Sequence, residues 1–157
     1  MWGGTRLAGL FPDSAPQEPA QVRPAQVRIG EAWFGEIGDR RPLVKLLDVH
    51  DRLSVQVHPD DALAAELHGA GSLGKHEAWI ILEAAPNAHL LLGRDPNVEP
   101  ARVDAALETG EDVAPLLARV AVSSGDVLDV PPGTLHALMP GLLVWEVQQP
   151  SDLTYRV

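Results

Sequence analysis

The chain has no cysteine, no long apolar run and few aromatic residues, and each absence narrows what it can be. Without cysteine, disulfide frameworks, thiolate zinc sites and cysteine nucleophiles are excluded. No apolar stretch approaches the ~18 residues that a membrane span requires. The amino-terminal segment is interrupted by glycine, threonine and arginine, which makes it a poor signal peptide. We therefore expect a cytoplasmic protein that does not bind membranes.

Positive charge is also scarce. Twelve Lys and Arg stand against 22 Asp and Glu, so the formal net charge is −10, and the basic residues form no run. Proteins that bind nucleic acids or anionic membranes present clustered basic residues. The charge balance therefore argues against both classes of partner.

Glycine and proline, in contrast, are frequent, with 14 residues of each among 157. The turns that they favour separate short β-like runs at 43–47, 53–57, 78–82, 90–92, 127–130 and 142–147. Helical patches are expected at 60–67, 101–108 and 113–118. This pattern predicts a mainly all-β fold, an antiparallel barrel or jelly roll with a few short helices in the connections. The length fits one domain over 1–157, with the proline-rich residues 12–24 as a loop or arm.

Polar residues alternate along the run at 53–58. In a strand, Ser54, Gln56 and His58 share one face, and Leu53, Val55 and Val57 share the other. This run is either an edge strand whose polar face meets solvent or a barrel strand whose polar face lines an internal site.

A second polar group precedes an apolar run. Lys75 and Glu77 alternate onto one face, which Trp79 and Ile81 continue. The pair could be a surface ion pair of little energetic weight, or a cation and a carboxylate ligand that enter a half-buried site.

The third segment is the most specific. Between Gly125 and His136 the order is glycine, five residues, proline, one residue, glycine, two residues, histidine. This spacing predicts a strand, a Pro-Gly turn and a histidine at the start of the next strand. It resembles the second motif of the cupins, small jelly-roll barrels that hold a divalent metal. The cupin pattern has asparagine where this chain has Pro140.

Together the segments resemble one cupin branch, the type I mannose-6-phosphate isomerases. The family's Gln-x-His-Pro-Asp, Gly-Lys-x-Glu and Gly-Thr-x-His patterns occur here as QVHPD, GKHE and GTLH. The segment 142–157 and the amino-terminal Trp-Gly-Gly and Gly-Glu-Ala-Trp also resemble family sequence. The resemblance implies metal ligands at Gln56, His58, Glu77 and His136. These donors suit zinc, with manganese, iron and cobalt as alternatives.

The resemblance also implies an activity, the interconversion of mannose 6-phosphate and fructose 6-phosphate through an enediol. Such a reaction requires a base, a group that stabilises the oxyanion and an anchor for phosphate. Lys75 and Arg156 would stabilise anionic oxygens, and Ser54 would bind the phosphate. Glu146 is the first candidate for the base, with a solvent-facing barrel residue as the equally weighted alternative.

Two other functions remain open at this stage. The chain could be a non-catalytic cupin that binds metal or a sugar phosphate, or a small metal cupin with other chemistry, since one fold hosts many functions. Family members continue past the Tyr-Arg segment, whereas this chain ends at Val157. We expect the surface that larger members bury to be covered in a homodimer, through a sheet face or edge.

Overall fold

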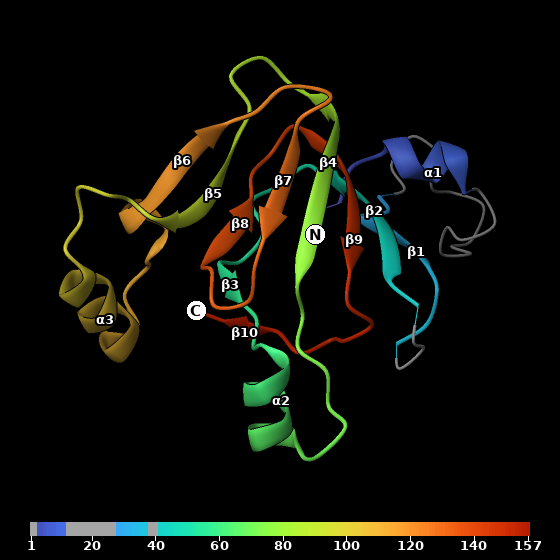
Figure 1. Ribbon diagram of the computed structural model, residues 1–157. Coiled ribbons are helices and arrows are strands. Elements are labelled where there is room, and N and C mark those ends of the chain that lie inside the picture. Colours follow the sequence, from blue (N-terminus) through green and yellow to red (C-terminus); the bar gives the residue numbers. More distant parts are fainter. Residues whose placement is uncertain (1–2, 12–27, 38–40) are drawn as a thin grey trace, which may run out of the picture.

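The computed structural model describes residues 3–11, 28–37 and 41–157, and in these residues ten short strands form two antiparallel sheets (Figure 1). The expected arm at 12–24 lies outside these residues. The first sheet contains, in spatial order, β1 (Glu31–Phe34), β2 (Leu43–Val49), β9 (Leu142–Gln148), β4 (Glu77–Ala84) and β7 (Val127–Val130). The second contains β10 (Tyr155–Arg156), β3 (Gln56–Val57), β8 (His136–Leu138), β5 (His89–Arg94) and β6 (Leu117–Ala121).

The two sheets pack face to face over the main core. Alternating residues of β2, β4 and β9 point inward, and among them Val49, Ile81 and Val144 have no exposed surface. They meet Leu90 of β5 and Leu138 of β8 in the same cluster. The period-2 pattern of the sequence thus produces the inner face of a sandwich.

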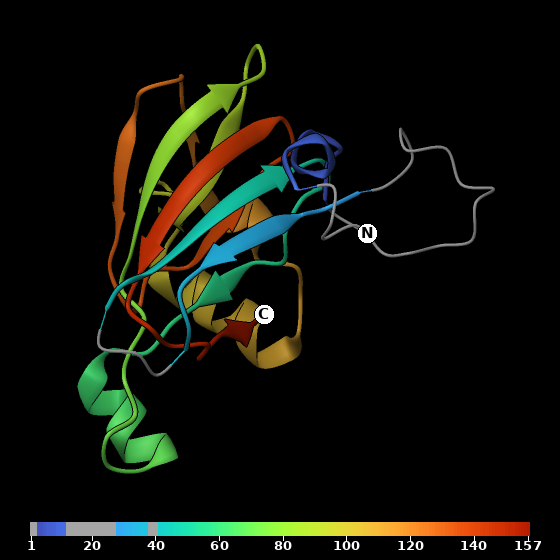
Figure 2. The ribbon, with the colours of Figure 1, turned by 90° about the vertical axis from the view of Figure 1, so that its right-hand side faces the viewer.

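The described residues also form three α-helices, which lie outside the sheets (Figures 1 and 2). The first, α1 (Arg6–Leu10), lies beside β1 and β2, and α2 (Asp61–His68) projects from the end of the barrel below β10. The longest, α3 (Pro100–Thr109), contributes Ala106 to a second apolar cluster with Val55 and Leu91. No helix in the described ranges is long and apolar enough to cross a membrane.

Helix punctuation in the sequence places α2 and α3 correctly. The side chain of Asp60 caps α2 by accepting a hydrogen bond from the Leu63 amide at 2.8 Å. Pro100 begins α3, and Gly110 ends it with a left-handed φ of 71°, which glycine adopts without a Cβ clash.

The expected fold class is confirmed, and two of the local predictions are corrected. The helical patch at 113–118 is wrong, since only Ala114–Leu116 forms a single 3-10 turn and Leu117 already begins β6. The run at 53–57 is a strand only at Gln56–Val57. Pairing with β5 explains why the predicted helix does not continue. From Leu117 to Ala121 the backbone N–H and C=O groups form hydrogen bonds with β5 in the sheet.

Candidate metal centre and active-site cavity

The carboxylate of Glu77 lies at the centre of a buried polar cluster between the sheets. Glu77 begins β4, His58 follows β3 and His136 begins β8, so three separated parts of the chain converge here. His58 Nε2 lies 3.3 Å from Glu77 Oε1, and His136 Nε2 lies 3.6 Å from Glu77 Oε2. One donor atom from each residue can be chosen so that all three lie within 4.8 Å of one another.

Backbone carbonyls fix the orientation of both imidazoles. His58 Nδ1 lies 3.0 Å from the carbonyl oxygen of Leu153, and His136 Nδ1 lies 2.9 Å from that of Thr134. A carbonyl can only accept, so each Nδ1 carries a proton, and Nε2 is the nitrogen of each ring that can bind a metal when the ring is neutral. Two imidazole nitrogens and a carboxylate directed at one point form a donor set that fits a divalent metal.

Lys75 is part of this cluster. Its ammonium donates to Glu77 Oε1 at 2.7 Å and lies 3.4 Å from His58 Nε2, with only 5% of the residue exposed. The predicted alternation of Lys75, Glu77, Trp79 and Ile81 onto one buried face is confirmed, and the surface ion pair is excluded.

The protonation states suit metal binding. Burial acts to raise the pKa of Glu77, but the hydrogen bond from His58 and the positive charge of Lys75 outweigh it and lower that pKa from 4.5 to about 2. Burial also lowers the pKa of His136, although the charge of Glu77 opposes the shift. Glu77 is therefore ionised and His136 neutral at pH 7, the forms that bind a metal.

Gln56 adjoins the cluster from β3. It pairs directly with His136 in the ladder between β3 and β8, and its side-chain amide lies 3.4 Å from Ser54 Oγ. The predicted polar inner face is confirmed, because Ser54 and Gln56 line a cavity and His58 contacts Glu77, although only Gln56 of the three lies in a strand.

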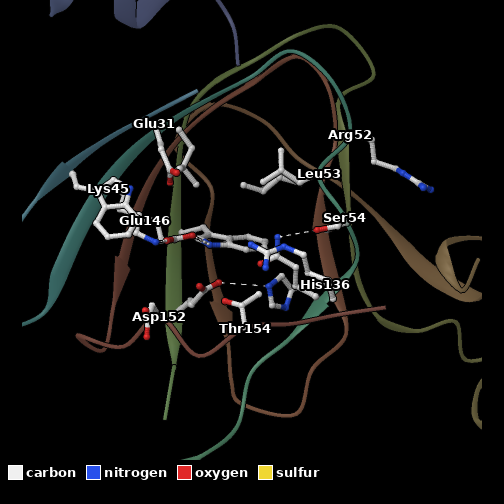
Figure 3. A pocket seen from close by; sticks show the side chains of 17 residues that line it. Glu31, Lys45, Arg52, Leu53, Ser54, His136, Glu146, Asp152 and Thr154 are labelled. Atoms are coloured by element: carbon white, nitrogen blue, oxygen red, sulfur yellow. Dashed lines mark hydrogen bonds and ion pairs between the residues drawn. The ribbon is translucent and has the colours of Figure 1, made fainter. Parts of the chain in front are cut away.

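A cavity of about 330 Å³ opens beside the cluster (Figure 3). Its volume lies at the lower end of the range for small-molecule sites. Glu77 and His136 form part of its wall, and its charged lining residues are Glu31, Glu77, Glu146, Asp152, Lys45, Arg52 and Arg156. The cavity wall thus combines four carboxylates with three basic side chains.

Glu146 lies in this wall, held by two donors. Lys45 Nζ lies 3.2 Å from its Oε1, and the indole of Trp79 donates to its Oε2 at 3.1 Å. Burial raises the pKa of Glu146, as does the charge of Glu77, while Lys45 and Lys75 act in the opposite direction. A buried carboxylate with a raised pKa is suited to proton transfer near neutral pH.

The other predicted residues divide between the cavity and the cluster. Ser54, Glu146 and Arg156 line the cavity, whereas Lys75 contacts the cluster without lining the cavity. The solvent-facing alternative for Glu146 is wrong, since only 5% of the residue is exposed.

Sequence reasoning missed Lys45 in β2. The signal was present: β2 reads LVKLLDV, and a lysine inside an apolar strand is expensive to bury unless it is paired. Trp33 is 44% exposed and lies over Lys45, with 4.5 Å between the ammonium and the ring centroid.

Comparisons with known proteins show which family the chain resembles in sequence. Residues 25–77 match the family model described as phosphomannose isomerase type I, catalytic domain. A Bacillus subtilis (strain 168) protein named "Probable mannose-6-phosphate isomerase GmuF" is 50% identical over 191 aligned residues, which include the whole of this chain. The chain belongs to the type I phosphomannose isomerase family.

Solved structures agree with the jelly roll. The crystal structure of the mannose 6-phosphate isomerase from Bacillus subtilis superposes with a TM-score of 0.77 at 34% identity over 99% of this chain. A mannose 6-phosphate isomerase bound with zinc and yttrium shares the fold at a TM-score of 0.61 and 17% identity, over 99% of this chain and 66% of its own. The chain spans 57% of GmuF and 56% of the Bacillus crystal structure.

We predict that His136→Ala abolishes zinc retention, because it removes one of the two imidazoles that face Glu77. The measurement is zinc per chain after dialysis, by atomic absorption. His76→Ala is the matched control, since His76 is exposed and pairs with Asp129 outside the cluster. Equal zinc content in wild type and His136→Ala would refute the site.

Proposed function

We propose that the chain is a metal-dependent isomerase that interconverts mannose 6-phosphate and fructose 6-phosphate. The observation that carries the proposal is the pairing of a buried His-Glu-His cluster with a carboxylate of raised pKa in the wall of one cavity. Membership of the type I family supports the choice of substrate, and the relatives named above carry this activity in their names.

The metal would be held by Gln56, His58, Glu77 and His136, and zinc is our first choice because imidazole and carboxylate ligands suit it. Manganese, iron and cobalt are the alternatives. When bound, the metal supplies a positive charge that stabilises the negative charge developing on the sugar oxygens. The +1 net charge of such a site does not repel an anionic sugar phosphate.

Glu146 acts as the proton-transfer group. It removes the proton from C2 of the open-chain aldose, and the C–H electron pair becomes the C1–C2 double bond of the enediol as the carbonyl oxygen gains a proton. Glu146 then returns its proton to C1, and the C2 hydroxyl loses a proton that replaces the one taken up at the C1 oxygen, so that the C2 carbonyl of the ketose forms. Lys45 and Trp79 occupy one acceptor site on each oxygen of Glu146, and a carboxylate offers about four in total, so sites remain for the substrate.

Anionic oxygens of the substrate are bound by the remaining predicted residues. Arg156 on β10 and Ser54 lie in the cavity wall, where Arg156 offers forked donors to phosphate and Ser54 a hydroxyl. Lys75 supplies a point charge beside Glu77. Glu146 and Arg156 are not required to hold a metal, which favours the isomerase over a cupin that only binds.

We predict that the zinc-loaded chain turns over mannose 6-phosphate in a coupled assay, and that Glu146→Gln lowers kcat by about 100-fold or more because the base is lost. The variant should keep its zinc, since Glu146 is not a ligand. Glu66→Gln, an exposed change on α2, is the control and should leave kcat unchanged. Absence of turnover by zinc-loaded wild type would reject the isomerase, and an unaffected Glu146→Gln would reject this base.

We also propose that the outer face of the first sheet binds a second copy of the chain. Ala32, Leu46, Trp145, Ile80 and Val127 pair in succession and form an apolar row across all five strands. Trp145 is 43% and Val127 70% exposed. This row contains no charged residue, so it can pack against its own copy despite the net charge of −10.

For this face we predict a dimer by light scattering at micromolar concentration, and a monomer in Trp145→Glu, which places a charge at the centre of the row. Leu63→Glu is the matched control, because Leu63 on α2 is 42% exposed but lies outside the row. A monomeric wild type, or dissociation by Leu63→Glu alone, would contradict the proposed interface.

A further inference from the structure

Both lysines of the chain are buried beside the cavity, although lysine is almost never fully buried unless it is paired. Lys75 contacts Glu77 and lies in the cluster already described. Lys45 is 7% exposed and lies in β2, on the other side of the cavity from His136 (Figure 3). The metal cluster therefore does not explain why a lysine is buried at position 45.

Lys45 has two close partners. Its ammonium lies 3.2 Å from Glu146 Oε1 and 4.5 Å from the centre of the Trp33 ring. Strand pairing enforces both contacts, because Lys45 is directly opposite Glu146 in the ladder between β2 and β9 and opposite Trp33 in that between β1 and β2. The ammonium is therefore held from both neighbouring strands.

Trp79 contacts the other oxygen of the Glu146 carboxylate. It lies directly opposite Glu146 in the ladder between β4 and β9, and its indole donates to Oε2. Donors from β2 and β4 thus hold the two oxygens of one carboxylate on the central strand β9. Two donors, one on each oxygen, restrict rotation of the carboxylate about its Cγ–Cδ bond and fix which lone pairs face the cavity.

We propose that Lys45 is a positioning residue that, together with Trp79, holds the Glu146 carboxylate in the orientation that reacts with substrate. This role rests on the proposed function of Glu146 and adds a residue that does not itself touch the reacting atoms. Burying an ion pair is costly and is weak evidence for stability, whereas fixing a reactive group to within about 0.5 Å is what catalysis requires. Trp33 completes the arrangement from the cavity rim.

The test is a double-mutant cycle on the zinc-loaded chain with Lys45→Met and Glu146→Gln. Lys45→Met is expected to lower kcat by about tenfold or more with little change in KM, because substrate binding is retained while the base is misplaced. In the Glu146→Gln background the same change should alter kcat by less than about twofold. Lys45→Arg, which keeps the charge and a donor, should recover much of the loss.

A second readout does not depend on activity. The indole proton of Trp79, identified by its loss in Trp79→Phe, is recorded in a proton–nitrogen spectrum of the zinc-loaded chain. It should move in Lys45→Met and stay in Lys45→Arg, because it reports the hydrogen bond to Glu146. Trp33→Leu, at a half-exposed site, should shift the Trp79 indole signal in the same direction but by less. This variant provides the test if Lys45→Met does not fold.

The outcomes separate this inference from the proposed function. No turnover by wild type, with a Trp79 signal that depends on Lys45, would reject the isomerase and keep the positioning role. Full additivity of the two substitutions in kcat, or an unmoved Trp79 signal in both Lys45→Met and Trp33→Leu, would overturn the role of Lys45.

Discussion

The buried charge of Glu77 is the constraint on which the rest of the site depends. A carboxylate that is 2% exposed is stable in its ionised form only if positive or donor groups surround it. Those groups are Lys75, which lies two positions before Glu77, His58, which follows β3, and His136, which begins β8. They meet only when the two sheets pack against one another. Closure of the jelly roll and assembly of this polar cluster are therefore coupled.

A second buried carboxylate, Glu146, has a pKa that is shifted in the opposite direction. Glu77 is surrounded by cationic and imidazole groups that lower its pKa to about 2, whereas burial and the charge of Glu77 raise the pKa of Glu146. Two carboxylates of one cavity thus differ in pKa, which suits Glu77 to bind a metal and Glu146 to exchange protons. Three of the chain's twelve basic residues, Lys45, Arg52 and Arg156, lie in the cavity wall together with four carboxylates.

Alternation of side chains along strands and the residues that begin and end helices made much of the fold and the site predictable from the sequence. The face shared by Glu77, Trp79 and Ile81 and the caps at Asp60 and Gly110 depend on local rules, and the structure follows them. Lys45 was missed because its partners Glu146 and Trp33 are distant in the chain and meet it only through strand pairing. The stretch 113–118 was mispredicted for a similar reason, since the ladder with β5 and not local propensity makes Leu117–Ala121 a strand.

The most direct test of the central claim is X-ray absorption spectroscopy of the zinc-loaded chain. If His58, Glu77 and His136 hold the metal, the spectrum will show a shell of nitrogen and oxygen at about 2.0–2.1 Å with the outer scattering of two imidazole rings. The same spectrum of His136→Ala reloaded with excess zinc will show at most one ring. A wild-type spectrum without imidazole scattering would contradict the account, because the buried cluster would then not be the metal centre.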